Sequence, residues 1–355
     1  MKHWKKLLSL ALTLALALSL AGCGKTDPQD TGAEDQTQTE EQTEEPVSES
    51  YAIAALKGPT AMGLVKLMSD TDEKAAQMLD SSKPYEGEVG NLYTFTLAAS
   101  ADEVSPLLMK GELDMACVPA NLAAVLYQKT EGDIVTLAVN TLGVLYIVEN
   151  GNAVTSMADL AGKTIVASGK GSTPEYALRY LLSENGLDPD ADVTIDWKSE
   201  HSECVTALAT GAATIAMLPQ PFVTVAENKI SGLRTALDLT EQWDALDNGS
   251  ALLTGVIVAR REVVEQNPAA VDAFLKDYAG SVEGVNANPA DAAELIGSYG
   301  IVEAAVAEKA LPHCNIVCIT GAEMKDKLSG YLQVLFDADA SSVGGALPGD
   351  NFYYG

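Results

Sequence analysis

The sequence predicts an α/β fold in which short apolar strands alternate with amphipathic helices in two lobes. Three observations support this fold class. Apolar runs are repeatedly followed by a turn and a helix start, a pattern typical of mostly parallel sheets with helices on both faces. The clearest such unit lies at 164–182, where an apolar run ends at Ser168-Gly169-Lys170-Gly171 and a helix start follows. Residues 51–355 are numerous enough to build two lobes.

Residues 1–22 have the pattern of a lipoprotein signal peptide. Three lysines within the first six residues precede an apolar stretch at 7–20, which is too short to span a bilayer comfortably. The stretch ends at Leu20-Ala21-Gly22-Cys23, which resembles a bacterial lipobox. The sequence therefore predicts cleavage before Cys23 and lipid modification, such as palmitate, on Cys23. A chance occurrence of these four residues is the alternative.

Residues 23–50 predict a disordered acidic tether, because they are rich in Glu, Asp, Thr and Gln and almost free of apolar residues. The whole chain has a formal net charge of −28, which argues against nucleic acid or an anionic membrane surface as a partner. We therefore expect a monomer on the extracytoplasmic face of the cell membrane, attached only through its lipid.

The first half of the folded part contains three strand–turn–helix units. The strand at 51–56 ends at Lys57-Gly58-Pro59-Thr60, and a helix is expected at 61–68. The strand at 93–98 leads to a helix that opens at Ser100. The strand at 115–118 ends at Pro119-Ala120-Asn121, where a third helix begins. In such sheets ligands collect beyond the carboxyl ends of the strands, so these turns are candidates for a binding site.

The remaining pattern continues this alternation. Further elements are expected as strands at 134–140, 144–149, 164–167, 193–197, 214–218 and 252–259, and as helices at 202–210, 222–228, 271–278, 291–298 and 324–336. Gly169 and Gly171 allow the backbone to approach a guest, while Ser172 or Thr173 can cap the following helix, whose first-turn amides face that guest. An ordinary α/β turn with good capping is the alternative. The tail at 342–355 has no assigned role.

Metal and cofactor sites are not expected. Cys117 lies in an apolar run and is interpreted as a core thiol. Cys314 and Cys318 are close in sequence, but neither a straight strand nor a regular helix favours disulfide geometry between them, and their pairing stays open. His313 beside Cys314 lacks further His or Cys residues that could complete a metal site.

Enzyme motifs are also missing from the sequence. Gly162-Lys163-Thr164 lacks the earlier glycine of a phosphate loop and precedes a strand instead of a helix. Neither His201 nor His313 stands in a nucleophile motif, and no G-x-S-x-G or H-E-x-x-H occurs. A carboxylate pair cannot be singled out among so many acids. The enzyme class is therefore the less favoured alternative.

Six segments together resemble the substrate-binding lipoproteins of ABC importers of the nitrate/sulfonate/taurine and thiamine-precursor group, which have the type II periplasmic-binding-protein fold. The similarity spans most of 51–300, and the order and spacing of the segments carry it. The segments are Leu56-Lys57-Gly58-Pro59-Thr60, Gly111-Glu112-Leu113-Asp114-Met115-Ala116, Asp159-Leu160-Ala161-Gly162-Lys163-Thr164, Gly169-Lys170-Gly171-Ser172-Thr173-Pro174-Glu175, Leu218-Pro219-Gln220-Pro221-Phe222 and Gly255-Val256-Ile257-Val258-Ala259-Arg260. Gln220 stands where this group commonly has an acid, which removes a charge partner for a cationic solute.

The resemblance implies two lobes that close on a solute and present it to a membrane permease. Lobe I would comprise 51–143 and 256–355, lobe II would comprise 147–253, and strands 144–149 and 252–259 would form the hinge. The solute would be a sulfonate- or nitrate-like anion or a pyrimidine-type thiamine precursor. A sensory lipoprotein without a transport role is the alternative within the same fold.

The expected ligand-binding residues come from both lobes. Met62 and Asn121 also have purely structural interpretations, as core and helix cap, and Lys57 and Lys170 as solvated loop charges. Trp197, Trp243 and Tyr176 could stack on a ring, although core or rim packing is the more frequent role of such residues. The expected set is Lys57, Gly58, Pro59, Thr60, Met62, Pro119, Asn121, Asn140 and Leu142 from lobe I and its first crossing, with Lys170, Gly171, Ser172, Thr173 and Gln220 from lobe II.

Overall fold

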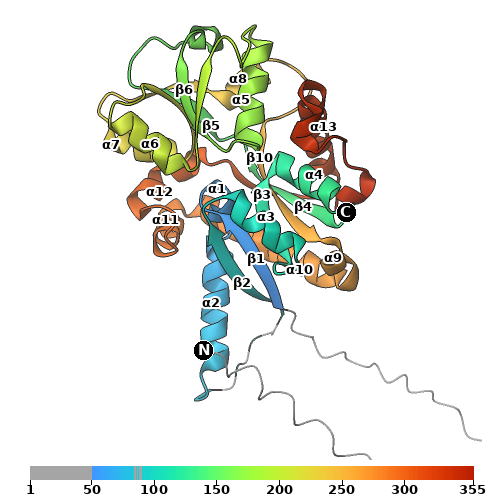
Figure 1. The fold of residues 1–355 in the computed structure, drawn as a ribbon. Coiled ribbons are helices and arrows are strands. Elements are labelled where there is room, and N and C mark those ends of the chain that lie inside the picture. Colours follow the sequence, from blue (N-terminus) through green and yellow to red (C-terminus); the bar gives the residue numbers. More distant parts are fainter. Residues whose placement is uncertain (1–49, 84, 86, 88–89) are drawn as a thin grey trace, which may run out of the picture. The chain divides into compact units, whose positions relative to one another are not determined.

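Two mixed β-sheets, each flanked by helices, make up the part of the chain that the computed structural model describes, residues 50–83, 85, 87 and 90–355 (Figure 1). The predicted signal peptide, Cys23 and the tether up to residue 49 lie outside the described residues. Within the described ranges, no helix combines the length and hydropathy needed to cross a membrane. The predicted α/β class with two sheets is confirmed.

The first sheet has six strands in the order β11-β4-β10-β3-β1-β2. β1 runs parallel to β2 and β3, whereas β10 runs antiparallel to both of its neighbours. The sheet is therefore more mixed in direction than the mostly parallel sheet expected. Its strands are β1 (Ser50–Leu56), β2 (Leu92–Ala98), β3 (Met115–Pro119), β4 (Ile134–Leu142), β10 (Leu253–Arg260) and β11 (Ile316–Ile319).

The second sheet has five strands in the order β7-β6-β8-β5-β9. β6 is parallel to β7 and β8, while β5 is antiparallel to β8 and β9. The strand that follows each crossing, β5 in the second sheet and β10 in the first, is antiparallel to its neighbours, and the edge strand β11 is also antiparallel to β4. The strands are β5 (Leu145–Glu149), β6 (Thr164–Ser168), β7 (Thr194–Lys198), β8 (Ile215–Pro219) and β9 (Arg234–Asp238).

Helices cover both faces of each sheet, as Figure 1 shows for the second sheet, with α5 and α8 on one side and α6 and α7 on the other. The α-helices are α1 (Pro59–Met62), α2 (Val65–Leu79), α3 (Ala101–Met109), α4 (Ala120–Lys129), α5 (Thr173–Glu184), α6 (His201–Ala209), α7 (Phe222–Lys229), α8 (Leu239–Asp244), α9 (Arg261–Gln266), α10 (Pro268–Ala287), α11 (Pro289–Ser298), α12 (Ala304–Ala310) and α13 (Gly321–Ala338). The 3₁₀ turns are η1 (Met157–Leu160), η2 (Leu311–His313), η3 (Ala340–Val343) and η4 (Asp350–Phe352).

The core follows the two-residue period of the strands. In β3, Ala116 and Val118 face the helices α3, α4 and α13, while Met115 and Cys117 face α2 and α10 on the opposite side. The cluster on the α4 and α13 side continues into the second sheet through Leu145 and the residues of α5. The two sheets therefore share one apolar core on this side of the molecule.

The chain passes between the sheets in short connections. β5 lies entirely in the second sheet and β10 entirely in the first, so neither expected hinge strand is shared. The crossings fall at Gly143 and Val144, and at residues 245–252. Asn315 fixes the first crossing by donating from Nδ2 to the Gly143 carbonyl at 2.6 Å. The expected boundaries of the lobes, 51–143 with 256–355 and 147–253, remain a prediction.

Several elements differ from the sequence-based expectation. The single helix expected at 61–68 is two helices, because α1 ends at Met62 and α2 begins at Val65. The short strands β9 and β11 and the helices α8 and α12 were not anticipated. Cys314 and Cys318, whose pairing was left open, are both free thiols, and the core position expected for Cys117 is confirmed.

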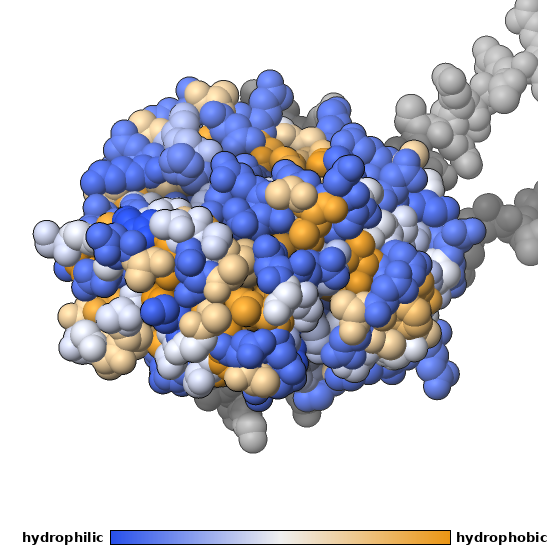
Figure 2. All heavy atoms as spheres, turned by 90° about the horizontal axis from the view of Figure 1, so that it is seen from above, coloured by the Kyte–Doolittle hydropathy of each residue, from blue (hydrophilic) through white to orange (hydrophobic). Residues whose placement is uncertain are grey.

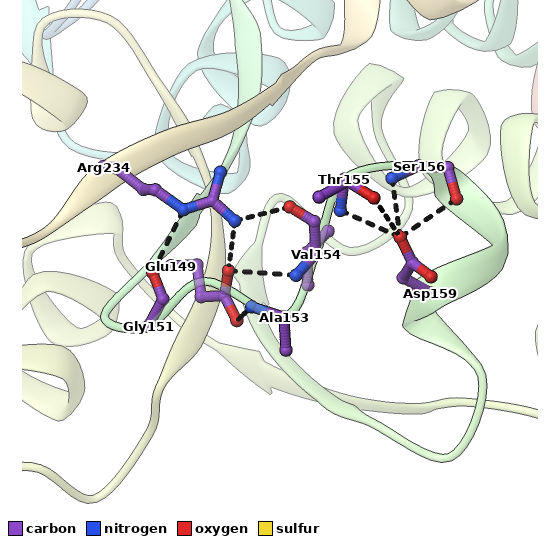
Figure 3. Close-up of polar contacts among 8 residues, drawn as sticks. All are labelled: Glu149, Gly151, Ala153, Val154, Thr155, Ser156, Asp159 and Arg234. Atoms are coloured by element: carbon purple, nitrogen blue, oxygen red, sulfur yellow. Dashed lines mark hydrogen bonds and ion pairs between the residues drawn. The ribbon is translucent and has the colours of Figure 1, made fainter.

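A buried polar network joins the ends of two strands in the second sheet (Figure 3). Glu149, at the end of β5, accepts hydrogen bonds from the amides of Ala153 and Val154 and from the guanidinium of Arg234 at 2.6 Å. Arg234 begins β9 and also donates to the Gly151 carbonyl at 3.0 Å. The network lies outside the cavity described below, so its role is to hold the loop after β5 against β9.

Candidate ligand-binding site

A cavity of about 590 Å³ is lined by residues from both sheets. The first sheet contributes the turn after β1, the start of α3, the end of β3 and part of α4. The second sheet contributes the turn after β6, the end of β7 with the start of α6, and the end of β8. The walls are therefore built mainly from the carboxyl ends of strands, where α/β sheets usually bind ligands.

The turn after β1 forms one wall. Gly58 has φ +146°, and a Cβ at this position would meet nothing within 4 Å, so the backbone here is open toward the cavity. The Gly58 carbonyl accepts from the amides of Ala61 and Met62, which fixes the first turn of α1. Thr60 donates its hydroxyl to the Leu56 carbonyl at 3.0 Å, so this side chain braces the turn as well as lining the cavity.

The turn after β6 forms the opposite wall. Gly169 and Gly171 have φ of +85° and +75°, a region that favours glycine. The Gly171 amide donates to the Glu175 carboxylate at 2.6 Å. Ser172 stands at the N-cap of α5, but its hydroxyl donates to the Gly169 carbonyl at 2.8 Å and does not cap the helix. Of the two expected N-cap residues, Ser172 takes the N-cap position, but without a capping hydrogen bond from its side chain, and α5 begins where the sequence indicated.

The cavity lining contains slightly more lysines than acids, unlike the acidic chain as a whole. Four lysines line it, namely Lys57, Lys129, Lys170 and Lys198, against three acids, Asp102, Glu103 and Glu200. A hydrogen bond from Lys198 to Asp196 raises the pKa of that ammonium, so Lys198 stays charged. The N-termini of α3, α5 and α6 also lie at the cavity. This combination favours an anionic group on a bound solute.

His201 is a cavity residue that sequence reasoning missed. Its Nδ1 lies 2.5 Å from the Ser168 hydroxyl, and its ring centroid is 5.0 Å from that of Phe222. Burial lowers the pKa of His201 to about 4, so the imidazole is neutral at physiological pH. Ser168 and His201 both line the cavity, where their side chains can form hydrogen bonds with a solute without adding net charge. The available signal was that His201 opens the helix after β7, at the same end of the sheet as the other turns.

Eight of the fourteen expected residues line the cavity, and they come from both sheets. These eight are Lys57, Gly58, Pro59, Thr60, Pro119, Lys170, Gly171 and Ser172. Cavity residues that the sequence-based set lacked include Ser100, Ser168, Lys198, Ser199 and His201. Trp197 also lines the cavity, whereas Trp243 is fully buried in the core beside Tyr331 and Tyr180.

The other six expected residues lie away from the cavity wall. Met62 is buried in the core, with its sulfur 3.8 Å from that of Cys314. Asn140 donates to the Thr60 carbonyl at 3.4 Å and so supports the turn from behind. The Gln220 side chain turns back to accept from the Thr224 hydroxyl at 2.9 Å. Leu142 packs at the end of β4 beside the core.

Asn121 and Thr173, the last two of the six, are fully buried and contact each other. The Thr173 hydroxyl donates to Asn121 Oδ1 at 3.3 Å, and Asn121 Nδ2 donates to the Ser342 carbonyl at 2.9 Å. They join α4 of the first sheet to α5 of the second sheet behind the cavity.

The cavity does not present a metal site. Within the described ranges, no group of three or more His, Cys, Asp or Glu side chains is placed to hold a metal ion. Besides the three carboxylates, the polar groups at the cavity are ammonium groups, hydroxyls, backbone amides and one neutral imidazole, which suit the binding of oxygen-rich anions.

Comparison with known proteins agrees with this geometry. Residues 86–311 match the family model described as the phosphonate periplasmic substrate-binding protein of ABC transporters. The search of curated proteins gives no significant match. Among solved structures, an ABC transporter protein from Parabacteroides distasonis aligns with a TM-score of 0.69 and 22% identity, over 87% of this chain and 99% of that chain.

Two further solved structures are of proteins described by the ligand that they bind. The periplasmic aliphatic sulphonate binding protein SsuA from Escherichia coli aligns with a TM-score of 0.65 and 17% identity, over 83% of this chain and 94% of its own. The alkanesulfonate-binding protein SsuA from Xanthomonas axonopodis pv. citri, bound to MOPS, aligns with a TM-score of 0.63 and 17% identity, over 85% of this chain and 96% of its own. At these identities the likeness shows the fold alone.

Proposed function

Because the chain belongs to the periplasmic phosphonate-type substrate-binding family of ABC transporters, we propose that its cavity binds a small organic oxyanion, a phosphonate or a sulfonate. Proteins of this family are the extracytoplasmic solute-binding components of importers. They bind small solutes and interact with a membrane permease, and the family is not one of enzymes.

The observation that carries the proposal is the charge of the cavity. Lysines from both sheets, Lys57 and Lys129 on one side and Lys170 and Lys198 on the other, line one space in a chain whose formal net charge is −28. A lysine ammonium is a strongly hydrated point charge that binds phosphate-like groups well. An oxyanion held between the two walls would be neutralised from both sides.

The neutral groups would set the orientation of the solute. In this proposal the Ser168 hydroxyl, 2.5 Å from Nδ1 of His201, donates to that nitrogen, and the ring keeps Nε2–H as a donor for the solute. The glycine turns at Gly58 and Gly171 leave room for close approach of the solute to the backbone. The cavity volume of about 590 Å³ accommodates an organic substituent beside the anionic group.

Solute binding would be coupled to a change in lobe orientation. The lobes we propose are 51–143 with 256–355 and 147–253, and the two chain crossings near residues 143–144 and 245–252 would act as the hinge. Hinges in two-lobed binding proteins are a few residues that absorb backbone rotation. In this proposal the protein performs no chemistry, and its affinity comes from displaced water and from charge-assisted hydrogen bonds.

The protein would act as a monomer tethered by a lipid on Cys23. Seen from above, the face over the second sheet is mostly hydrophilic, with apolar residues in small groups (Figure 2). This face lacks the broad apolar surface typical of obligate interfaces. Cys23→Ala is expected to move the protein from the membrane fraction to the soluble fraction without altering solute affinity, and unchanged membrane attachment would refute the anchor.

A binding screen tests the proposed function. Thermal-shift and calorimetric titrations would use methylphosphonate, ethanesulfonate, nitrate and a neutral pyrimidine. At least one organic oxyanion is expected to bind with one-to-one stoichiometry. Lys170→Ala is expected to weaken it by about 1.5–3 kcal/mol, the contribution of a hydrogen bond to a charged group. Lys163→Ala, which removes a lysine outside the cavity lining, is the matched control. Binding of the pyrimidine alone, or equal effects of both variants, would contradict the proposal.

A further inference from the structure

A buried polar junction connects the two sheets behind the cavity. Asn121 of α4 uses both ends of its amide, accepting from the Thr173 hydroxyl at 3.3 Å and donating to the Ser342 carbonyl at 2.9 Å. All three residues are fully buried. One asparagine therefore links the first sheet, the second sheet and the C-terminal tail through a chain of two hydrogen bonds.

The tail is fixed along α4, which gives the junction a rigid support. Gly344 has φ +85°, and a Cβ there would lie 3.1 Å from Cβ of Gln128, so the tail crosses α4 in close contact. Gln128 donates to the Ala346 carbonyl at 2.9 Å, and the Tyr127 hydroxyl donates to Asn351 Oδ1 at 2.6 Å. The Ser342 carbonyl is thereby held in place above Asn121.

The start of α5 needs such an anchor because it lacks a side-chain cap of its own. The Ser172 hydroxyl donates to the Gly169 carbonyl and does not accept from the first turn of α5. The turn before the helix contains Gly169 and Gly171, which leave the backbone conformationally free in other states. Thr173 is the first helical residue of α5, and its hydroxyl donates to Asn121 of α4, a helix that packs on the first sheet.

We propose that Asn121, braced by the tail, is a positioning residue that holds the first turn of α5 and the Lys170–Ser172 loop at the cavity in one lobe orientation. This inference rests on the proposed function, because it assigns the junction a role in solute binding at that cavity. The hydrogen bond at Thr173 forms only when α5 lies against α4. A movement of the lobes that separates these helices would therefore shift the six residues Lys170–Glu175 together.

The junction also has unused hydrogen-bonding capacity. Among the described residues, the Ser342 hydroxyl oxygen is one of the few that are buried without a hydrogen-bond partner. Burying such groups costs stability, so their presence at a junction calls for an explanation.

The test compares three variants in two measurements. Thr173→Val removes the hydroxyl at nearly constant volume, and Thr173→Ser restores it. Thr224→Val is the matched control, because the Thr224 hydroxyl also donates to a side-chain amide oxygen, Oε1 of Gln220, at 2.9 Å between buried residues, but within the second lobe and outside the cavity lining. The first measurement is the affinity for the oxyanion found in the binding screen.

The second measurement needs no solute. Pulsed electron paramagnetic resonance would record the distance distribution between spin labels at the exposed positions Lys110, after α3, and Thr210, after α6. Labels introduced through non-natural amino acids avoid reaction with Cys318, which is partly exposed.

Thr173→Val is expected to broaden the distance distribution and to weaken affinity by about three- to tenfold, the range that follows from losing one net hydrogen bond. Thr173→Ser and Thr224→Val are expected to resemble the wild type in both measurements. The inference is overturned if Thr173→Val behaves as Thr224→Val does. If the wild type binds no oxyanion, the proposed function fails, while the distance distributions still decide whether the junction controls lobe orientation.

Discussion

His201 is the residue whose chemistry depends most on its surroundings. Burial lowers its pKa to about 4 from an ordinary value near 6.5, so the folded protein resists protonation of this ring. Between these two pH values the unfolded chain binds a proton that the folded chain does not. His201 therefore contributes stability that is fully present above pH 6.5 and decreases as the pH falls toward 4.

We expect His201→Asn to flatten the loss of stability between pH 6.5 and 4, measured by urea unfolding at several pH values. The asparagine keeps an acceptor near the Ser168 hydroxyl but does not titrate. His313→Gln is the control, because His313 is exposed at the end of η2. An equally steep pH dependence in His201→Asn and the wild type would show that His201 is not held neutral by the fold.

The contribution of Arg234 to folding stability depends on its buried partner, Glu149. Glu149 is almost fully buried, and burial raises its pKa, but the hydrogen bonds from Val154, Ala153 and Arg234 outweigh that effect and lower the pKa overall (Figure 3). The carboxylate thus contributes stability above its ordinary pKa of 4.5 that is lost as the pH falls.

Arg234→Ala is expected to reduce the free energy of unfolding by about 1–3 kcal/mol at pH 7, because it leaves a buried carboxylate without one of its donors. Arg179→Ala is the matched control. Arg179 pairs with Asp190, whose side chain is 74% exposed, and such surface pairs contribute less than about 1 kcal/mol. Equal losses in the two variants, measured by chemical denaturation, would contradict the role given to the Glu149 network.

Residue types in the turns could be predicted from the sequence, but side-chain directions could not. Lys57 and Lys170 were found because they follow strands at glycine turns, and both line the cavity. Gln220 follows a strand as well, yet its side chain turns back to Thr224. Sequence order gives the position of a residue at the sheet edge, whereas its rotamer depends on neighbours from distant segments.

At the scale of elements, the break between α1 and α2 shows a limit of helical periodicity. The apolar spacing through 61–68 fits a single helix, but the chain turns at Gly63. A Cβ at Gly63 would lie 2.7 Å from the Tyr278 hydroxyl and 2.9 Å from Cγ2 of Ile316. The close approach of α10 and β11, which are far away in the sequence, therefore requires glycine here.

Gly63→Ala is expected to destabilise the protein by about 1–3 kcal/mol through overpacking. Gly280→Ala is the control, since Gly280 lies inside α10 and a Cβ there meets nothing within 4 Å. That substitution is expected to stabilise the helix by roughly 0.5–1 kcal/mol. Opposite signs in thermal unfolding support the packing argument, and a neutral Gly63→Ala would contradict it.

The strand–turn–helix units were predictable because each is local. β1, β3, β6 and β8 all precede helices whose starts carry recognisable turn residues. The antiparallel entry of β10 and β5 was not predictable from periodicity, since a strand buried on both faces shows the same apolar run in either direction. The strand β9 was missed because Arg234, Thr235 and Asp238 make most of it polar, and β11 was missed because its apolar run is only four residues long.

At the scale of the whole molecule, the proposed solute binding depends on the two sheets lining one cavity. Each sheet presents the carboxyl ends of its strands, with lysines and helix N-termini, to one cavity. The chain is strongly acidic elsewhere, so the cavity is where an anion would find favourable charge. Composition alone indicated only which partners to exclude, because net charge does not report the local balance at a site.

The most direct test is a crystal structure with 2-bromoethanesulfonate, whose bromine can be located by anomalous scattering. We expect one molecule in the cavity, with sulfonate oxygens within hydrogen-bond distance of lysines from both walls, Lys57 or Lys129 and Lys170 or Lys198. A sulfonate bound only outside this cavity, or an empty cavity at saturating concentration, would contradict the account.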